Sequence, residues 1–112
     1  MHQETTPLFY SLPENTDINT IDWVYISGYH RLSEQFIAQH KDRVDWSTIS
    51  SYQKLSEQFI AQHSDKVDWF YISGYQQLTE EFIVQHKDKV NWSYILSNQM
   101  LSHEFIDKYK TN

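Results

Sequence analysis

A tryptophan returns every 23 residues along this 112-residue chain, at positions 23, 46, 69 and 92. Four more apolar columns keep the same interval: an isoleucine three residues after each tryptophan, then a leucine, a phenylalanine and a second isoleucine. A fixed period of about 20 to 50 residues marks a repeat architecture, in which each unit buries its apolar face against its neighbours. Four units exceed the roughly three that such an array needs for stability. The period therefore predicts one repeat domain.

The third unit, residues 67–89, indicates how each repeat folds. Asp68 and Thr79 are residue types that favour helix N-caps, and each is bracketed by apolar residues at the spacing of a hydrophobic staple. Acidic residues follow Thr79 and basic residues end the unit, as the helix dipole favours. These signals predict a short helix over about residues 68–73, a tight connection over 74–77 and a longer helix over about 79–87.

The segment after each tryptophan also has high β-propensity, so a strand-plus-helix coil of the leucine-rich type is the alternative. The recurring tryptophan and isoleucine stand three residues apart, which places them on one face of a helix but on opposite faces of a strand. The second unit also has Ser47 and Thr48 where the third has Phe70 and Tyr71, which weakens the strand interpretation. We therefore predict an all-α fold, a short α-solenoid of four helix–turn–helix repeats.

The predicted organisation follows the period. Residues 1–20 lie outside it and are expected to form an irregular cap whose apolar residues cover the first unit: Leu8, Phe9, Tyr10 and Leu12. The four-repeat solenoid occupies residues 21–112, with units at 21–43, 44–66, 67–89 and 90–112. The fourth unit departs most from the others, with Asn91, Leu96 and His103 in place of Asp, Ser and Glu. We interpret it as a terminal repeat with a polar outer face.

Composition and charge exclude several classes of function. The absence of cysteine excludes disulfides and thiolate metal sites, and no apolar run is long enough for a membrane span. Residues 1–22 carry four acidic residues and no lysine or arginine, whereas residues 23–112 carry 11 acidic and 9 basic residues. A surface that follows a phosphate backbone needs a basic stripe, so we expect no direct nucleic-acid binding. A cytoplasmic monomer or weak dimer is expected.

Three rows of polar residues recur with the period and invite a chemical role: His40, His63 and His86; Asp22, Asp45 and Asp68; and Glu34, Glu57 and Glu80. Stacked helices lie about 8–10 Å apart, too far for two histidines to share a metal at bonds of ~2.0–2.1 Å. The histidines are expected near helix C-termini, the aspartates as caps and the glutamates in first turns. Residues repeated along a rod do not converge on one substrate. We expect no metal, no cofactor and no enzymatic activity.

Positions that differ between copied units are where binding specificity can be encoded. The tryptophan column is expected in the core, whereas the tyrosines of two columns, one of them in the predicted connection (Tyr29, Tyr52 and Tyr75), are either contact surface or structural shell. Phe70 stands where units two and four have serine, so its ring is expected to anchor a partner rather than to pack. The candidate protein-contact residues are Phe70, Tyr25, Tyr71, Tyr94, Arg31, Lys54 and Gln77.

The pattern Val/Ile-Asp-Trp-x-x-Ile-Ser-x-Tyr-Gln-x-Leu-Ser-Glu-x-Phe-Ile covers residues 21–112 and resembles 23-residue tandem repeats in proteins of giant DNA viruses and some phages. The resemblance implies a viral or mobile-element origin, with the host cytoplasm as location, and no chemistry. The sequence thus predicts a non-enzymatic module that binds a protein, and the implied viral origin makes the host one source of that partner. Two alternatives stay open: a small acidic inhibitor of a host nucleic-acid-handling defence system (anti-CRISPR-like), and a purely structural spacer.

Overall fold

The computed structural model of the chain describes residues 8–110, and this part contains eight α-helices, one short 3-10 helix and no β-strand. The prediction of an all-α helical repeat is confirmed, and the strand-plus-helix alternative is wrong for these residues. The first helices of the four units are α1 (Trp23–Tyr29), α3 (Trp46–Tyr52), α5 (Trp69–Tyr75) and α7 (Trp92–Asn98). The second helices are α2 (Glu34–Gln39), α4 (Glu57–Gln62), α6 (Glu80–Gln85) and α8 (His103–Tyr109), and the 3-10 helix η1 spans Ile18–Thr20.

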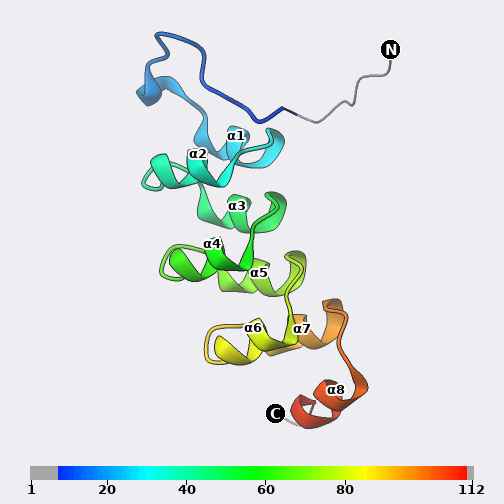
Figure 1. Cartoon of the computed structure of the whole chain (residues 1–112). Coiled ribbons are helices and arrows are strands. Elements are labelled where there is room, and N and C mark those ends of the chain that lie inside the picture. The colour runs from blue at the N-terminus through cyan, green and yellow to red at the C-terminus, as the bar shows by residue number, and fades with distance from the viewer. Residues whose placement is uncertain (1–7, 111–112) are drawn as a thin grey trace, which may run out of the picture.

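The helices stack in two columns (Figure 1). The first helices form one column, in which α1 lies against α3, α3 against α5 and α5 against α7, and the second helices form the other column. The chain therefore advances along the array by one helix pair per period. Because the loops bond to the units on both sides of them, the residue at which one unit ends and the next begins stays a prediction.

The C-terminal ends of the helices differ from the predicted ones. The first helix of the third unit runs on through Gly74 to Tyr75 and ends where Gln76 becomes extended, with φ −95° and ψ 147°. The second helix stops at Gln85 rather than near Lys87, because the backbone of His86 leaves the helical region while its N–H still bonds to carbonyl groups of the last turn. The connection therefore spans residues 76–79, two residues later than predicted, and the first half of the predicted connection is helix.

Helix capping follows the sequence prediction in every unit. The first helices begin after a side chain that accepts a hydrogen bond from a first-turn amide: Asp22, Asp45, Asp68 and Asn91. The second helices begin in the same way after Ser33, Ser56, Thr79 and Ser102. The aspartate row and the hydroxyl row thus satisfy backbone N–H groups that a helix start leaves without partners.

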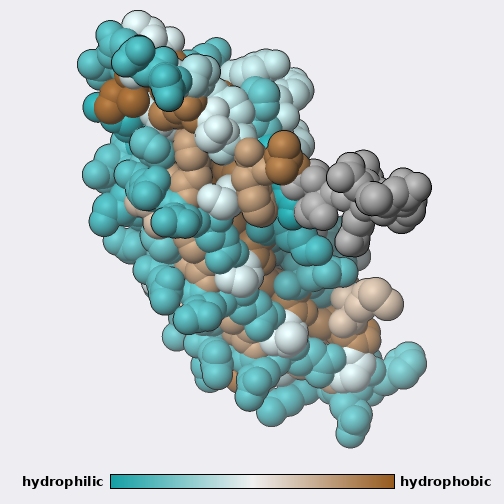
Figure 2. Space-filling view, turned by 45° about the horizontal axis from the view of Figure 1, so that its top comes forward, coloured by the Kyte–Doolittle hydropathy of each residue, from teal (hydrophilic) through white to brown (hydrophobic). Residues whose placement is uncertain are grey.

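Isoleucines form the centre of the core. Six of them have no exposed surface: Ile37, Ile49, Ile60, Ile72, Ile83 and Ile95. On the face turned toward the viewer in Figure 2, hydrophobic residues form a band between hydrophilic margins. The apolar columns therefore pack into one continuous core along the array.

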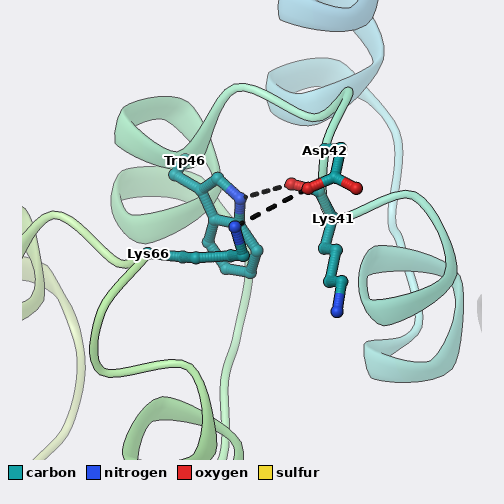
Figure 3. A network of polar contacts seen from close by, with 4 residues as sticks. All are labelled: Lys41, Asp42, Trp46 and Lys66. Carbon is teal, nitrogen blue, oxygen red and sulfur yellow. Dashed lines mark hydrogen bonds and ion pairs between the residues drawn. The ribbon is translucent and has the colours of Figure 1, made fainter.

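The tryptophans, which were predicted to lie in the core, are half-buried and pack against its margin. Trp69 packs mainly within its own unit, with its ring centroid 6.2 Å from that of Phe82 and 5.3 Å from that of His86. Each indole N–H donates to a carbonyl group of the segment that precedes its helix. Figure 3 shows this for Trp46, whose Nε1 donates to the Lys41 carbonyl at 2.8 Å beside an ion pair of Lys66 with Asp42 at 3.7 Å. Each tryptophan therefore joins its unit to the preceding loop.

A row of glutamine side chains connects successive first helices. Gln76 is 6% exposed, and its Nε2 donates to the carbonyl groups of Ser50 and Gln53 at 2.9 and 2.7 Å. Its Oε1 accepts from the N–H of Leu55 at 3.1 Å. Gln53 and Gln99 make the equivalent three bonds to the units before them. The sequence analysis did not single out this row, although it holds the array together.

Two further rows of side chains, the serines and the glutamates, form hydrogen bonds to the unit that follows. The Ser50 hydroxyl accepts from the N–H of Asp68 at 3.0 Å. The Glu57 carboxylate accepts from the N–H and the hydroxyl of Thr79 at 2.6 and 3.1 Å. The glutamates do lie in first turns, as predicted, but their carboxylates bond to the following unit.

The departures in the terminal units follow from these bonds. The fourth unit has Leu96 in the serine row and His103 in the glutamate row, so it lacks both of the side chains that bond forward in the units before it. The prediction that this unit differs because it needs a polar outer face is therefore incomplete, since Leu96 is apolar. At the other end, His30 replaces the glutamine, and the ring of Tyr10 stacks on it at 4.3 Å.

The segment before the first unit covers it only in part. The Tyr10 N–H donates to the Arg31 carbonyl at 2.7 Å, and its ring also meets Phe36 edge-on at 6.0 Å. Leu8 is 90% exposed and Phe9 is 51% exposed, so the prediction that these two residues close the end of the core is wrong. Residues 1–7 of the predicted cap lie outside the described part of the chain.

The two glycines give a matched test of how closely the first helices pack. A Cβ atom on Gly74 would overlap the Tyr94 ring, with Cε2 at 2.8 Å, whereas one on Gly28 would meet the Thr48 methyl at 3.0 Å and the Tyr52 ring at the ordinary contact distance of 3.8 Å. We expect Gly74→Ala to lower the free energy of unfolding by about 1–3 kcal/mol through overpacking. Gly28→Ala should stay within about 1 kcal/mol of the wild type, because better helix propensity offsets the close methyl. Urea denaturation followed by circular dichroism measures both.

The double variant Gly74→Ala/Tyr94→Thr supplies the control. It recreates at units three and four the small pair that Gly28 and Thr48 form at units one and two. We expect it to be more stable than Gly74→Ala alone. A Gly74→Ala variant as stable as Gly28→Ala would contradict the close approach of α5 and α7.

Candidate protein-contact surface

The outer side of the first-helix column carries exposed aromatic side chains. Within each seven-residue helix, the tryptophan and the isoleucine face inward, so that the third and seventh positions, which are four apart, share the outer side. The rings at these positions lie beside each other, with centroids 4.8 Å apart for Tyr25 and Tyr29 and 6.1 Å apart for Tyr71 and Tyr75. We call this surface the aromatic face, and it comprises Tyr25, Tyr29, Tyr52, Phe70, Tyr71, Tyr75 and Tyr94.

The aromatic face is uncharged along its whole length. None of the first helices contains an aspartate, glutamate, lysine or arginine, since their sequences are WVYISGY, WSTISSY, WFYISGY and WSYILSN. Charges occur only where these helices begin and end. The capping aspartates stand at the N-terminal edge, and Arg31 and Lys54 follow the C-terminal edge of α1 and α3.

Two hollows lie along this face, on either side of Tyr52. The first, of about 490 Å³, is lined by Tyr25, Tyr29 and Tyr52 over Gly28 and Thr48. The second, of about 230 Å³, lies between Tyr52, Tyr71 and Tyr75 over the small residues of α3. The short side chains of Ser47, Thr48 and Ser51 leave this space, and the three other units all carry a tyrosine at the position of Thr48. The second unit thus separates two tyrosine-lined sites.

Two more hollows follow the loops at the C-terminal edge. One, of about 370 Å³, is lined by Tyr29, Tyr52, His30, Arg31 and Lys54. The other, of about 900 Å³, runs along the next loops past Tyr52, Lys54, Tyr75, Gln77 and Met100. Met100 is 95% exposed there. Tyr52 therefore borders all four hollows.

The predicted contact residues fall into two groups. Tyr25, Phe70, Tyr71 and Tyr94 lie on the aromatic face, and Arg31, Lys54 and Gln77 lie exposed along its C-terminal edge. Phe70 is 42% exposed, but its ring also packs against Tyr94 of the next unit, with centroids 4.3 Å apart. The expectation that this ring is free of packing is therefore wrong. Phe70 both joins two units and presents an edge to solvent.

The candidate list lacked the three most exposed aromatic residues of the face. Tyr29, Tyr52 and Tyr75 are 78%, 73% and 61% exposed, and they end the first helices instead of standing in the connection. Their regular spacing was visible in the sequence. The sequence left their role open between contact surface and structural shell, because the helix was predicted too short and residues in a turn have no defined face.

The histidine row lies away from this face. His63 caps α4, and its ring lies between Phe59 and Trp46 of its own unit, at centroid distances of 4.2 and 5.6 Å. His40 and His86 lie in the same way. Over residues 8–110, no group of three or more histidine, aspartate or glutamate side chains could hold a metal ion.

Comparison with known proteins gives no further information about this surface. No protein-family model, no curated protein and no solved structure matches the chain. Among the helices of residues 8–110, none is both long and apolar enough to cross a membrane.

Proposed function

We propose that the chain is a non-enzymatic helical-repeat module that binds a protein partner through its aromatic face. The observation that carries this proposal is the exposure of five aromatic side chains on one uncharged face, from 42% for Phe70 to 78% for Tyr29. Tyrosine is enriched at protein interfaces, where exposed aromatic side chains supply most of the binding energy. A monomer or weak dimer is proposed for the free protein.

The use of the polar residues supports a role without catalysis. The repeated aspartates cap helices, and the repeated glutamates and glutamines bond to neighbouring units. Within residues 8–110, no buried side-chain nitrogen or oxygen lacks a hydrogen-bond partner.

The resemblance of the repeat to tandem repeats of giant DNA viruses and phages suggests where to look for the partner. We propose a viral or mobile-element origin and a partner in the host cytoplasm. A host lysate is accordingly the source from which the partner is to be captured and then purified for quantitative binding.

The variant Phe70→Ser tests the proposed function. We expect it to weaken binding of the purified partner by more than about 1 kcal/mol, because an exposed aromatic anchor is lost. The melting temperature should fall by only a few degrees, since two other units carry serine at this position. Calorimetric titration and a thermal melt measure the two effects separately.

Val84→Ser is the matched control. Val84 is 38% exposed, which is close to the exposed fraction of Phe70, but it lies on α6 in the other column. This variant should keep full affinity. Equal losses in both variants, or none in either, would show that the partner does not bind the aromatic face.

An acidic inhibitor is the second candidate, and the charge of the N-terminal segment favours it. Residues 8–22 contain Glu14, Asp17 and Asp22 and no lysine or arginine; the further acidic residue Glu4 lies outside the described residues. This candidate requires Phe70→Ser to be silent, while neutralising Glu4, Glu14 and Asp17 abolishes binding and added salt weakens it steeply. The same titrations separate the two candidates.

A further inference from the structure

We propose that the occupant of the aromatic face is an extended, proline-rich peptide segment in the polyproline II conformation, with an acidic residue at every third position. This inference rests on the proposed function and names the chemistry of the partner. It follows from the spacing of the tyrosines, the composition of the hollows and the charges at one edge of the face.

The first step is the match between two periods. Stacked helices lie about 8–10 Å apart, and each of α1, α3 and α5 ends in an exposed tyrosine: Tyr29, Tyr52 and Tyr75. A polyproline II helix repeats every three residues at about 3.1 Å each, or about 9 Å per turn. One turn of the peptide therefore spans one unit of the array. An α-helix repeats at about 5.4 Å and a strand at about 6.6–6.8 Å, so neither stays in register.

The second step is the chemistry of the hollows on either side of Tyr52. The smaller is lined by tyrosine rings and by small uncharged side chains, and the larger adds Val24 and Asp22 to its tyrosine rings. Aromatic-lined grooves are the sites at which proline-rich segments dock. Proline has no backbone N–H, so its ring enters a tyrosine-lined hollow without leaving a donor unpaired. Exposed tyrosine hydroxyl groups donate to the carbonyl groups that a polyproline II backbone keeps free.

The third step is charge complementarity along the C-terminal edge. Arg31 and Lys54 line a hollow of about 370 Å³ together with Tyr29 and Tyr52, and no acidic residue lines it. In the part of the chain from residue 8 to residue 110, neither cation forms an ion pair. The threefold symmetry of the peptide places every third side chain on the same side. With prolines in the tyrosine-lined hollows, the third residue of each turn faces this edge, and a carboxylate there meets Arg31 or Lys54.

The test uses the full-length protein and synthetic peptides followed by fluorescence anisotropy. The probe is a peptide of Pro-Pro-Glu triplets, and its controls are Pro-Pro-Lys triplets, which change the charge, and Gly-Ser-Glu triplets, which keep the charge and remove the prolines. We expect the Pro-Pro-Glu peptide to bind at least about tenfold more tightly than either control, since charge and conformation both contribute.

Variants of the protein locate the binding. Tyr52→Ala should weaken the Pro-Pro-Glu complex by about tenfold or more, because Tyr52 borders every hollow. Lys54→Glu should reverse the preference, so that the Pro-Pro-Lys peptide binds more tightly. Lys89→Glu makes the same charge change at an exposed loop residue after α6 and should leave the preference unchanged. Thermal melts verify that each variant is folded.

The outcomes distinguish this inference from the function on which it rests. Equal binding of all three peptides, an unaltered Tyr52→Ala complex, or a preference that Lys54→Glu does not reverse would overturn the proline-rich ligand. So would a concentration-dependent dimer that Tyr52→Ala abolishes, because a second copy would then occupy the face. If the peptides fail while the captured partner still loses affinity in Phe70→Ser, only the class of ligand is wrong. If that partner binds both Phe70→Ser and Tyr52→Ala normally, the proposed function itself fails.

Discussion

Gln76→Ala is expected to lower the free energy of unfolding by roughly 3 kcal/mol or more, because each buried polar group left without a partner costs ~1–3 kcal/mol. The change removes one acceptor and two donor bonds at a side chain that is 6% exposed. Three backbone groups of the second unit then lose their partner: the carbonyl groups of Ser50 and Gln53 and the N–H of Leu55. Urea denaturation followed by circular dichroism measures the loss.

The neighbouring residue provides the control. Gln77 is exposed, so Gln77→Ala should change the free energy of unfolding by no more than about 0.5 kcal/mol. Gln76→Glu should be more damaging than Gln76→Ala, because it buries a carboxylate against two carbonyl oxygens. Equal stabilities of the Gln76→Ala and Gln77→Ala variants would show that the glutamine row does not hold the units together.

The Gln76→Ala variant, which loses these three hydrogen bonds, also tests how the array unfolds. In a stack of repeats, stability is approximately the sum of the intrinsic terms of the units and the terms of their interfaces. Gln76 lies at the interface of units two and three, in the middle of the four. Gln76→Ala should therefore broaden the urea transition and let amide exchange in α5 and α7 separate from that in α1 and α3.

The sequence pattern was sufficient to predict the helices and the residues at which they begin. Trp69 and Ile72 share a helix face only at helical spacing, and Asp68 and Thr79 are cap residues at the points where helices begin. These signals are local, because a cap and its amide lie two or three residues apart in the chain. Helix ends were less accurate, since the stop at Gln76 depends on bonds to another unit.

The hydrogen bonds between units could not be predicted from the sequence, because they join residues that lie far apart in the chain. Gln76 bonds to groups 21 to 26 residues before it, and nothing in its immediate sequence distinguishes it from the exposed Gln77. One signal was available: the bonding rows change only in the terminal units, to His30 at the start and to Leu96 and His103 at the end. A residue that is kept in three units and changed in the first or the fourth is a candidate for a bond between neighbouring units.

The candidate surface was predicted in part, because exposure on a helix depends on its phase. Phe70 and the edge residues Arg31 and Lys54 were proposed from their variation between units, and Tyr25 from the recurrence of tyrosine beside the tryptophan, neither of which requires a structure. Tyr52 was not, although it borders every hollow of the face. Its importance comes from the small residues beside it in α3, and only the packing of α1, α3 and α5 brings the tyrosines of three units to one surface.

Trp69→Ala is expected to cost about 3 kcal/mol of unfolding free energy, the lower end of the range for removing a tryptophan from a core. The lower end applies because the indole is half-buried. Its loss removes the ring contacts with Phe82 and His86 and leaves the Ser64 carbonyl without the indole N–H that donates to it at 2.9 Å. Trp69→Phe should cost less, since a ring remains to fill the space. Urea denaturation followed by circular dichroism ranks the two variants.

Trp92→Ala is the matched comparison in the fourth unit. Trp92 packs on Phe105 and Tyr109 at centroid distances of 6.2 and 4.8 Å, much as Trp69 packs in its own unit. The local loss is therefore similar, but unit four has one neighbouring unit where unit three has two, so fewer interface terms depend on it. We expect Trp92→Ala to cost less than Trp69→Ala and to unfold α7 and α8 ahead of the rest. Small and equal losses at both positions would mean that the indoles contribute little to packing, and the tryptophan row would then have to be considered as a second exposed aromatic surface for a ligand.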